Sequence, residues 1–189
     1  MNNNVLAERI SLWKEMPRNN PVELKEADEY FDNVLMPLAR DRFIETQKIR
    51  QSYYGMVLTL GTSWQPLALS ISALRPEKIL ILCTEDTITL VDKLKDFVGI
   101  DDSCCKVAIV DRSECQGIYT EMKAAYEEWE RYGMVCVDIT GGTKAMSSSA
   151  AMMGAVLGMD IYYVESKYLP LYRRPEPGSE YLKHLSNPR

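Results

Sequence analysis

The chain has 189 residues, of which 46% are hydrophobic and 26% are charged, and its formal net charge is -5. This length and apolar content suit one compact domain with a small accessory piece. The acidic balance argues against a broad basic face for long nucleic acid, so an anionic ligand would need a local site. There is no long apolar run, and the polar start Met1 to Asn4 lacks the pattern of a secretory signal. We therefore expect a cytoplasmic protein without a membrane partner.

The cysteine and histidine content argues against a metal centre. The five cysteines show no CxxC spacing, and His184 is the only histidine. Metal sites in proteins usually need closer groupings of such ligands. Cys83 and Cys136 fall within apolar runs, where cysteine acts as a small hydrophobe. We expect neither a metal nor a cofactor.

Residues 1–50 predict a helical extension. Asn20 is a candidate N-cap, Pro21 suits the first helical turn, and Glu23 is the partner residue of a capping box. Apolar residues then recur at helical spacing, and Pro37 should kink or interrupt the helix. This extension must pack onto another part of the protein.

From residue 51 to 168 the pattern changes to short apolar runs that alternate with helical segments. The expected strands are Tyr54 to Leu60, Lys78 to Cys83, Lys106 to Asp111, Met134 to Asp138 and Asp160 to Glu165. The expected helices are Gln65 to Leu74, Asp86 to Val98, Gly117 to Arg131 and Gly142 to Leu157. Such alternation is typical of a parallel sheet with crossover helices. The predicted fold class is therefore α/β and Rossmann-like.

Residues 169–189 form a proline-rich tail with one expected strand around Glu180 to Leu185. We interpret the tail as a hairpin or a linker. Its end, Asn187-Pro188-Arg189, carries neither a helix cap nor a charged run, which favours one domain of a longer protein.

Ligands of an open parallel sheet bind beyond the carboxyl ends of the strands. The loops expected there begin with Gly61, Thr84, Arg112 and Thr140, and all are polar. The last one, Thr140-Gly141-Gly142-Thr143-Lys144, has more glycine and hydroxyl groups than helix capping needs. A lysine in the first helical turn also opposes the helix dipole, so a negative ligand should compensate it.

Several readings of these loops stay open. The Thr140 to Lys144 loop is neither a P-loop nor a GxGxxG fingerprint, and no Ser/His/Asp arrangement is present. Trp64 either stacks on a nucleobase or packs in the core. Glu85 and Asp86 form either an acid/base pair or, more simply, the start of a helix.

Three segments together resemble a known family, the CRISPR-associated Rossmann fold (CARF) domains that sense cyclic oligoadenylates in type III CRISPR antiviral defence. They are Leu60 to Ser63, Thr84-Glu85, and above all Asp138 to Met146. The resemblance implies a homodimer that holds one cyclic tetra- or hexa-adenylate, a small cyclic RNA, on its two-fold axis. The ligand contacts implied or considered at these loops are Gly61, Thr62, Ser63, Trp64, Thr84, Glu85, Arg112, Thr140, Gly141, Gly142, Thr143 and Lys144.

The resemblance leaves the activity open. Family members usually regulate an attached effector, such as a nuclease or a deaminase, and any effector here must lie beyond Arg189 or on another chain. An alternative is a ring nuclease that slowly cleaves the bound ring without a metal, using Ser63, Thr143 and Lys144. A third reading is a generic Rossmann-like domain that binds a mononucleotide or serves as a scaffold.

Overall fold

A computed structural model describes residues 3–111 and 115–185. The fold divides into two compact units. Unit 1 comprises Met1–Lys48 and Ser166–Tyr181, and unit 2 comprises Ile49–Glu165 and Leu182–Arg189. Within the described ranges, no helix is long and apolar enough to cross a membrane.

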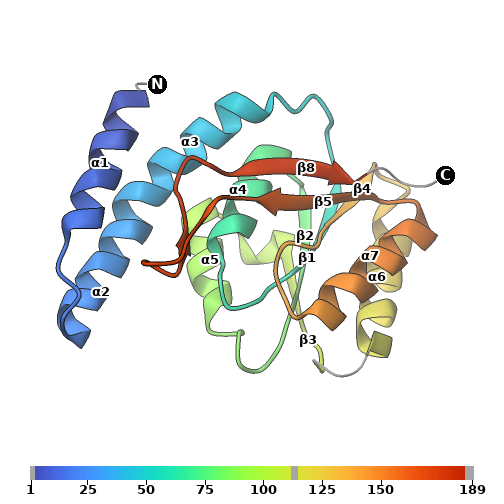
Figure 1. Cartoon of the computed structure of the whole chain (residues 1–189). Helices are drawn as coiled ribbons and strands as arrows, with labels where there is room; N and C mark the ends of the chain where they lie inside the picture. The colour runs from blue at the N-terminus through green and yellow to red at the C-terminus, as the bar shows by residue number, and fades with distance from the viewer. Residues whose placement is uncertain (1–2, 112–114, 186–189) are drawn as a thin grey trace. The chain divides into compact units, whose positions relative to one another are not determined.

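Unit 2 is built on a six-stranded sheet with the order β3-β2-β1-β4-β5-β8. The strands are β1 (Gly55–Thr59), β2 (Lys78–Cys83), β3 (Cys105–Ile109), β4 (Val135–Asp138), β5 (Asp160–Glu165) and β8 (Tyr181–Leu185). The first five pair in parallel, and Figure 1 shows β8 running against β5. Because β1, β2 and β4 are covered on both faces, they read as continuous apolar runs rather than alternating ones.

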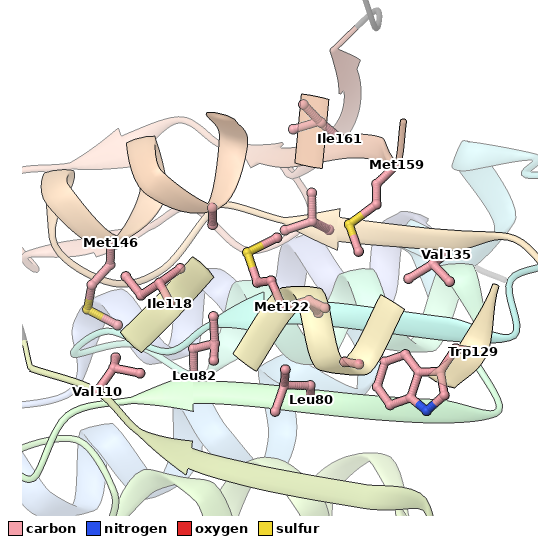
Figure 2. Close-up of a cluster of buried hydrophobic side chains, with 14 residues drawn as sticks. Leu80, Leu82, Val110, Ile118, Met122, Trp129, Val135, Met146, Met159 and Ile161 are labelled. Carbon is pink, nitrogen blue, oxygen red and sulfur yellow. The ribbon is translucent and has the colours of Figure 1, made fainter. Parts of the chain in front are cut away.

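The crossover helices are α4 (Gln65–Leu74), α5 (Leu90–Val98), α6 (Cys115–Trp129) and α7 (Lys144–Leu157). Figure 2 shows side chains of α6 and α7, among them Ile118, Met122 and Met146, converging on residues of the strands. The small-residue helix α7 approaches the sheet closely, because a Cβ on Gly154 would lie 2.7 Å from the Val137 side chain. This agrees with the close packing expected from its composition.

Most expected elements lie within a few residues of those observed, but α5 begins at Leu90 instead of Asp86. The preceding turn explains the difference. The amides of Thr87 and Ile88 both donate to the Thr84 carbonyl, and the buried Thr87 hydroxyl forms hydrogen bonds of its own. Thr84 to Thr89 is therefore a run of turns rather than the first turns of a helix.

A polar network connects the neighbouring strands β5 and β8 with Tyr53, which precedes β1. The Tyr53 hydroxyl donates to Asp160 over 2.6 Å and also lies 2.6 Å from the Tyr162 hydroxyl. His184 of β8 pairs with Asp160 over 3.1 Å and stacks on Tyr162. Burial raises the pKa of Tyr53, and the bond to Asp160 raises it further. The sole histidine thus contacts β5 through a side chain that stays exposed.

Unit 1 contains α1 (Asn3–Glu15), α2 (Pro21–Tyr30), a π-helical segment η1 (Phe31–Leu35) and α3 (Met36–Gln47). Asn20 caps α2 by accepting from the Val22 and Glu23 amides. The regular helix is interrupted at η1, directly before Pro37 in the first turn of α3. A missing proline amide and a π-helical turn at one point are consistent with the interruption expected there.

A short antiparallel hairpin completes unit 1, formed by β6 (Tyr168–Leu169) and β7 (Arg174–Pro175). Its Tyr172 ring lies 4.8 Å from Trp13, and the Arg18 guanidinium lies over both rings. Arg174 pairs with Asp28 over 2.6 Å. The hairpin is therefore joined to the helices by aromatic and charged contacts.

Candidate functional site

The strand order places a topological switch point between β1 and β4. The chain proceeds outward from β1 to β2 and β3 on one side, and from β4 to β5 on the other. Loops that follow two such strands diverge and leave a crevice beyond the carboxyl ends, where ligands of open α/β sheets bind. The Gly61 to Ser63 loop follows β1 and the Thr140 to Lys144 loop follows β4. Both predicted loops therefore lie at the switch point.

The two loops touch through their backbones. A Cβ on Gly141 would lie 2.1 Å from the Thr59 carbonyl oxygen and 3.0 Å from the Gly61 amide nitrogen. A Cβ on Gly61 would lie 2.6 Å from the Gly142 nitrogen. Of these three glycines, only Gly142 has a positive φ, at +80°. Gly61 and Gly141 are instead required by the close approach of one loop to the other.

Side chains of β1, β4 and α7 form hydrogen bonds with the backbone of the Thr140 to Lys144 loop. The Gly141 carbonyl accepts from the Thr59 hydroxyl over 2.7 Å and from the Ser147 hydroxyl over 2.6 Å. The Thr140 amide donates to Asp138 over 2.7 Å, and the Thr140 hydroxyl accepts from the Val164 amide over 2.7 Å. The hydroxyl predicted to meet the ligand at Thr140 is thus already engaged with β5.

Asp138 is a fully buried acid at the end of β4. Burial raises the pKa of its carboxyl, while the hydrogen bond from the Thr140 amide lowers it. One of its oxygens accepts from Thr140, whereas the other has no hydrogen-bond partner within the described part of the chain. Asp138, Thr59 and Ser147 were not among the predicted site residues. A charged or hydroxyl residue at the end of an apolar strand was the available signal for the first two.

The amino terminus of α7 carries the remaining groups of this loop. Thr143 is the N-cap, and its hydroxyl accepts from the Met146 amide over 3.2 Å. Lys144 follows as the first helical residue, is exposed, and forms no ion pair with residues 3–111 or 115–185. No acidic residue lies in the first turn. An anion at this end would be stabilised by both the helix dipole and the ammonium group.

The loop after β1 presents exposed Thr62 and Ser63, but Trp64 is buried. Its side chain is 5% exposed, and its ring packs on Phe97 with centroids 5.1 Å apart. Trp64 was expected either to stack on a base or to pack in the core, and the structure shows core packing. Its ring is covered, so it cannot stack on a base in this conformation. We therefore leave Trp64 out of the proposed contacts.

A cavity of about 280 Å³ opens beside the ends of β2 and β3. Its lining residues are Thr84, Glu85, Asp86, Ile109, Val110 and Asp111. Thr84 is buried and its hydroxyl lies 3.3 Å from that of Thr87, which also donates to the Leu60 carbonyl after β1. Glu85 is exposed. Of the two residues predicted to flank the ligand, Thr84 therefore stabilises the turn, and Glu85 lines the cavity with an exposed side chain.

Arg112, the remaining predicted contact, lies outside the described residues. Among those that are described, no group of three or more histidine, cysteine, aspartate or glutamate side chains is arranged to hold a metal ion. The structure thus brings together Gly61 to Ser63 with Thr140 to Lys144 at the switch point, with Thr84 and Glu85 beside β1 along the same edge.

No protein-family model matches the chain. It is, however, 32% identical over 144 residues to the CRISPR system endoribonuclease Csm6 of Thermus thermophilus. The chain is homologous to Csm6. The match covers 73% of this chain but only 30% of the Thermus protein.

Parts of two solved structures resemble this chain. Can2 from Sulfobacillus thermosulfidooxidans, in complex with cyclic tetra-adenylate, matches with a TM-score of 0.53 at 16% identity, over 61% of this chain and 32% of Can2. Enterococcus italicus Csm6, bound to cyclic hexa-2'-fluoro-hexa-dAMP, gives a TM-score of 0.49 at 13% identity, over 66% and 35% of the two chains. Together with the homology to Csm6, the likeness to Can2 confirms the predicted CARF-like α/β fold with its mostly parallel sheet.

Proposed function

We propose that this chain binds a cyclic oligoadenylate and acts as a sensor in type III CRISPR defence. The observation that carries the proposal is the pair of glycine loops in backbone contact at the switch point, with the exposed Lys144 at the start of α7. Homology to Csm6 and a fold shared with Can2, which was solved with cyclic tetra-adenylate, support it. The site combines backbone amides and a cation, as phosphate groups require.

We further propose that two copies of the chain form one site around the ring. A cyclic oligonucleotide with identical units has rotational symmetry, and an isologous dimer presents Thr143 and Lys144 twice. One set of groups then neutralises both halves of the ring. Ligand binding would shift the equilibrium between two arrangements of the dimer and so regulate an effector, on the same or another polypeptide.

Within this site, Glu85 is proposed to contact a base rather than a phosphate. Strands lie about 4.8 Å apart, so the cavity at β2 and β3 is about two strand spacings from the crevice between β1 and β4. A nucleotide bridges such a separation from phosphate to base. Glu85 would repel a phosphate, because both groups are negatively charged. Its carboxylate can instead accept a hydrogen bond from the exocyclic amino group of adenine.

Calorimetry of the 189-residue chain with cyclic tetra-adenylate and cyclic hexa-adenylate tests the proposal. We expect binding of at least one ring with one ring per two chains. Lys144→Ala should lower affinity about 10- to 100-fold, the range for a hydrogen bond to a charged group. Lys93→Ala, which removes an exposed lysine of α5, is the matched control and should change affinity little.

Two results would contradict parts of the proposal. Absence of binding to either ring would remove the sensor function, and one ring per single chain would remove the shared dimer site. Mass spectrometry of the ring after incubation with excess protein separates the sensor from the predicted ring nuclease. An intact ring agrees with a sensor, whereas a linear product would assign cleavage to the chain.

A further inference from the structure

The carbonyl of Gly141 is held by two hydroxyl groups from different elements. Thr59 of β1 donates to it over 2.7 Å, and Ser147 of α7 donates over 2.6 Å. A carbonyl oxygen has two lone pairs, so these two donors saturate it. Thr59 is fully buried, and Ser147 is partly buried. The donors therefore hold the carbonyl on the inner side of the loop.

These two hydrogen bonds fix the orientation of the peptide unit between Gly141 and Gly142, which could otherwise flip. The peptide unit between Gly141 and Gly142 is planar and trans, so its N–H points away from its carbonyl. Neither flanking residue has a Cβ, and Gly142 already has φ of +80°, which glycine adopts freely. A flip of this unit would meet little steric resistance from its own side chains. Only its partners decide which side of the peptide faces outward.

We propose that Thr59 and Ser147 are positioning residues that keep the Gly141 carbonyl turned inward and so make the loop selective for anions. This inference rests on the proposed function. With the carbonyl inward, the exposed side of the loop presents peptide N–H groups and Lys144. With the carbonyl outward, a partial negative charge would face the phosphate and repel it. The two hydroxyls act on ligand affinity through the peptide and do not contact the ligand.

The test compares variants that remove one hydroxyl with variants that retain it. Thr59→Val keeps the shape of the side chain but removes the donor, and Ser147→Ala does the same in α7. Each should lower affinity for cyclic tetra-adenylate about tenfold, as expected when one buried hydrogen bond is lost. Thr59→Ser restores the donor and should recover most of the affinity.

Ser72→Ala is the matched control, because the Ser72 hydroxyl donates over 2.6 Å to the Ala68 carbonyl of its own helix, α4. It should leave affinity unchanged. An amide NMR spectrum of the free protein gives a readout that general destabilisation would not move. In Thr59→Val, we expect the Gly142 signal to shift and broaden while signals of α6 stay in place.

The outcomes separate this inference from the proposed function. If the wild-type chain binds no cyclic adenylate, the proposed function and this role fall together. If the wild type binds and both Thr59→Val and Ser147→Ala bind equally well, the positioning role alone is overturned. Failure of Thr59→Ser to recover affinity would also overturn it, because volume rather than the hydroxyl would then matter.

Discussion

In unit 2 the helices and loops pack on the strands through apolar side chains and through glycines that allow close backbone contact. In unit 1 the hairpin contacts the helices through charged and aromatic groups. Gly141 and Gly154 leave room for a neighbouring element at van der Waals contact. In unit 1, Arg18 lies over two rings and Glu176 pairs with two lysines. The first kind of contact depends on volume, and the second depends on pH and salt.

Because of this difference, we expect the stability of the two units to respond to different substitutions and conditions. A tryptophan in each unit permits separate measurement, because Trp13 lies in unit 1 while Trp64 and Trp129 lie in unit 2. A form with Trp64→Phe and Trp129→Phe reports on unit 1 alone. We expect the largest effects where backbone meets backbone and the smallest where both partners of an ion pair are exposed.

Gly141→Ala should have the largest effect. Its Cβ would lie 2.1 Å from the Thr59 carbonyl oxygen, which is backbone and cannot move aside alone. We expect unit 2 to lose about 3 kcal/mol or more, as severe overpacking does, and ligand binding to be lost as well. Denaturant unfolding followed by Trp129 fluorescence measures the loss.

Gly117→Ala is the matched control within unit 2. Gly117 lies in α6, and an added Cβ would meet Val110 at an ordinary 3.8 Å. Alanine in a helix is favoured over glycine by about 0.5–1 kcal/mol, so this change should stabilise unit 2. Equal effects of the two substitutions would refute the role given to close backbone contact.

Unit 1 should depend on pH through Glu180, whose pKa burial raises from 4.5 to about 7. The folded state then binds more protons than the unfolded state between these values. Stability therefore falls as pH rises from about 5 to about 7, in total on the order of 3 kcal/mol. Unfolding of unit 1 at pH 5 and pH 8, followed by Trp13, measures the fall.

Glu180→Gln should flatten this dependence. The glutamine side chain can still accept from the Gly178 amide, which now donates to the Glu180 carboxyl over 2.6 Å, but it does not titrate. Unit 2 should keep its own profile in this variant. A profile of unit 1 that stays as steep without Glu180 would assign the dependence to another group.

The sequence predicted the sheet of unit 2 well, and the physical reason is its burial. After Lys78, the strand that ends at Cys83 is apolar and buried because helices cover both faces, so it stands out against the helical segments around it. The loop from Thr140 to Lys144 was found because glycines, hydroxyls and a lysine at a helix start are rare together. Local composition was sufficient for both.

Contacts that form only when the chain is folded could not be predicted in this way. The support that Thr59 and Ser147 give to Gly141 joins positions 82 and 6 residues apart. Likewise, Trp64 reads equally well as a core residue or a stacking platform until Phe97 is placed beside it. The tail divides too, because β6 and β7 belong to unit 1 while Leu182 and the rest of β8 join the sheet.

Arg18→Met should have an intermediate effect, confined to unit 1. The Arg18 guanidinium lies 4.9 Å from the Trp13 ring and 4.8 Å from the Tyr172 ring, and it donates to the Met16 and Trp13 carbonyls. Loss of these contacts should cost about 2 kcal/mol. Arg9→Met, an exposed change in α1, should cost far less. A comparable loss in Arg9→Met would show that charge alone, rather than stacking, is measured.

The smallest effect should come from exposed ion pairs, of which each unit has a matched example. Lys25 pairs with Glu29 in α2 over 3.6 Å, and Lys123 pairs with Glu127 in α6 over 3.7 Å. Because water screens such pairs, double-mutant cycles should give less than about 0.5 kcal/mol in both units. A coupling several times larger in α2 than in α6 would show that unit 1 gains stability from exposed charge in general. Equal and small couplings would instead locate its charge dependence in the stacked and buried groups, Arg18 and Glu180.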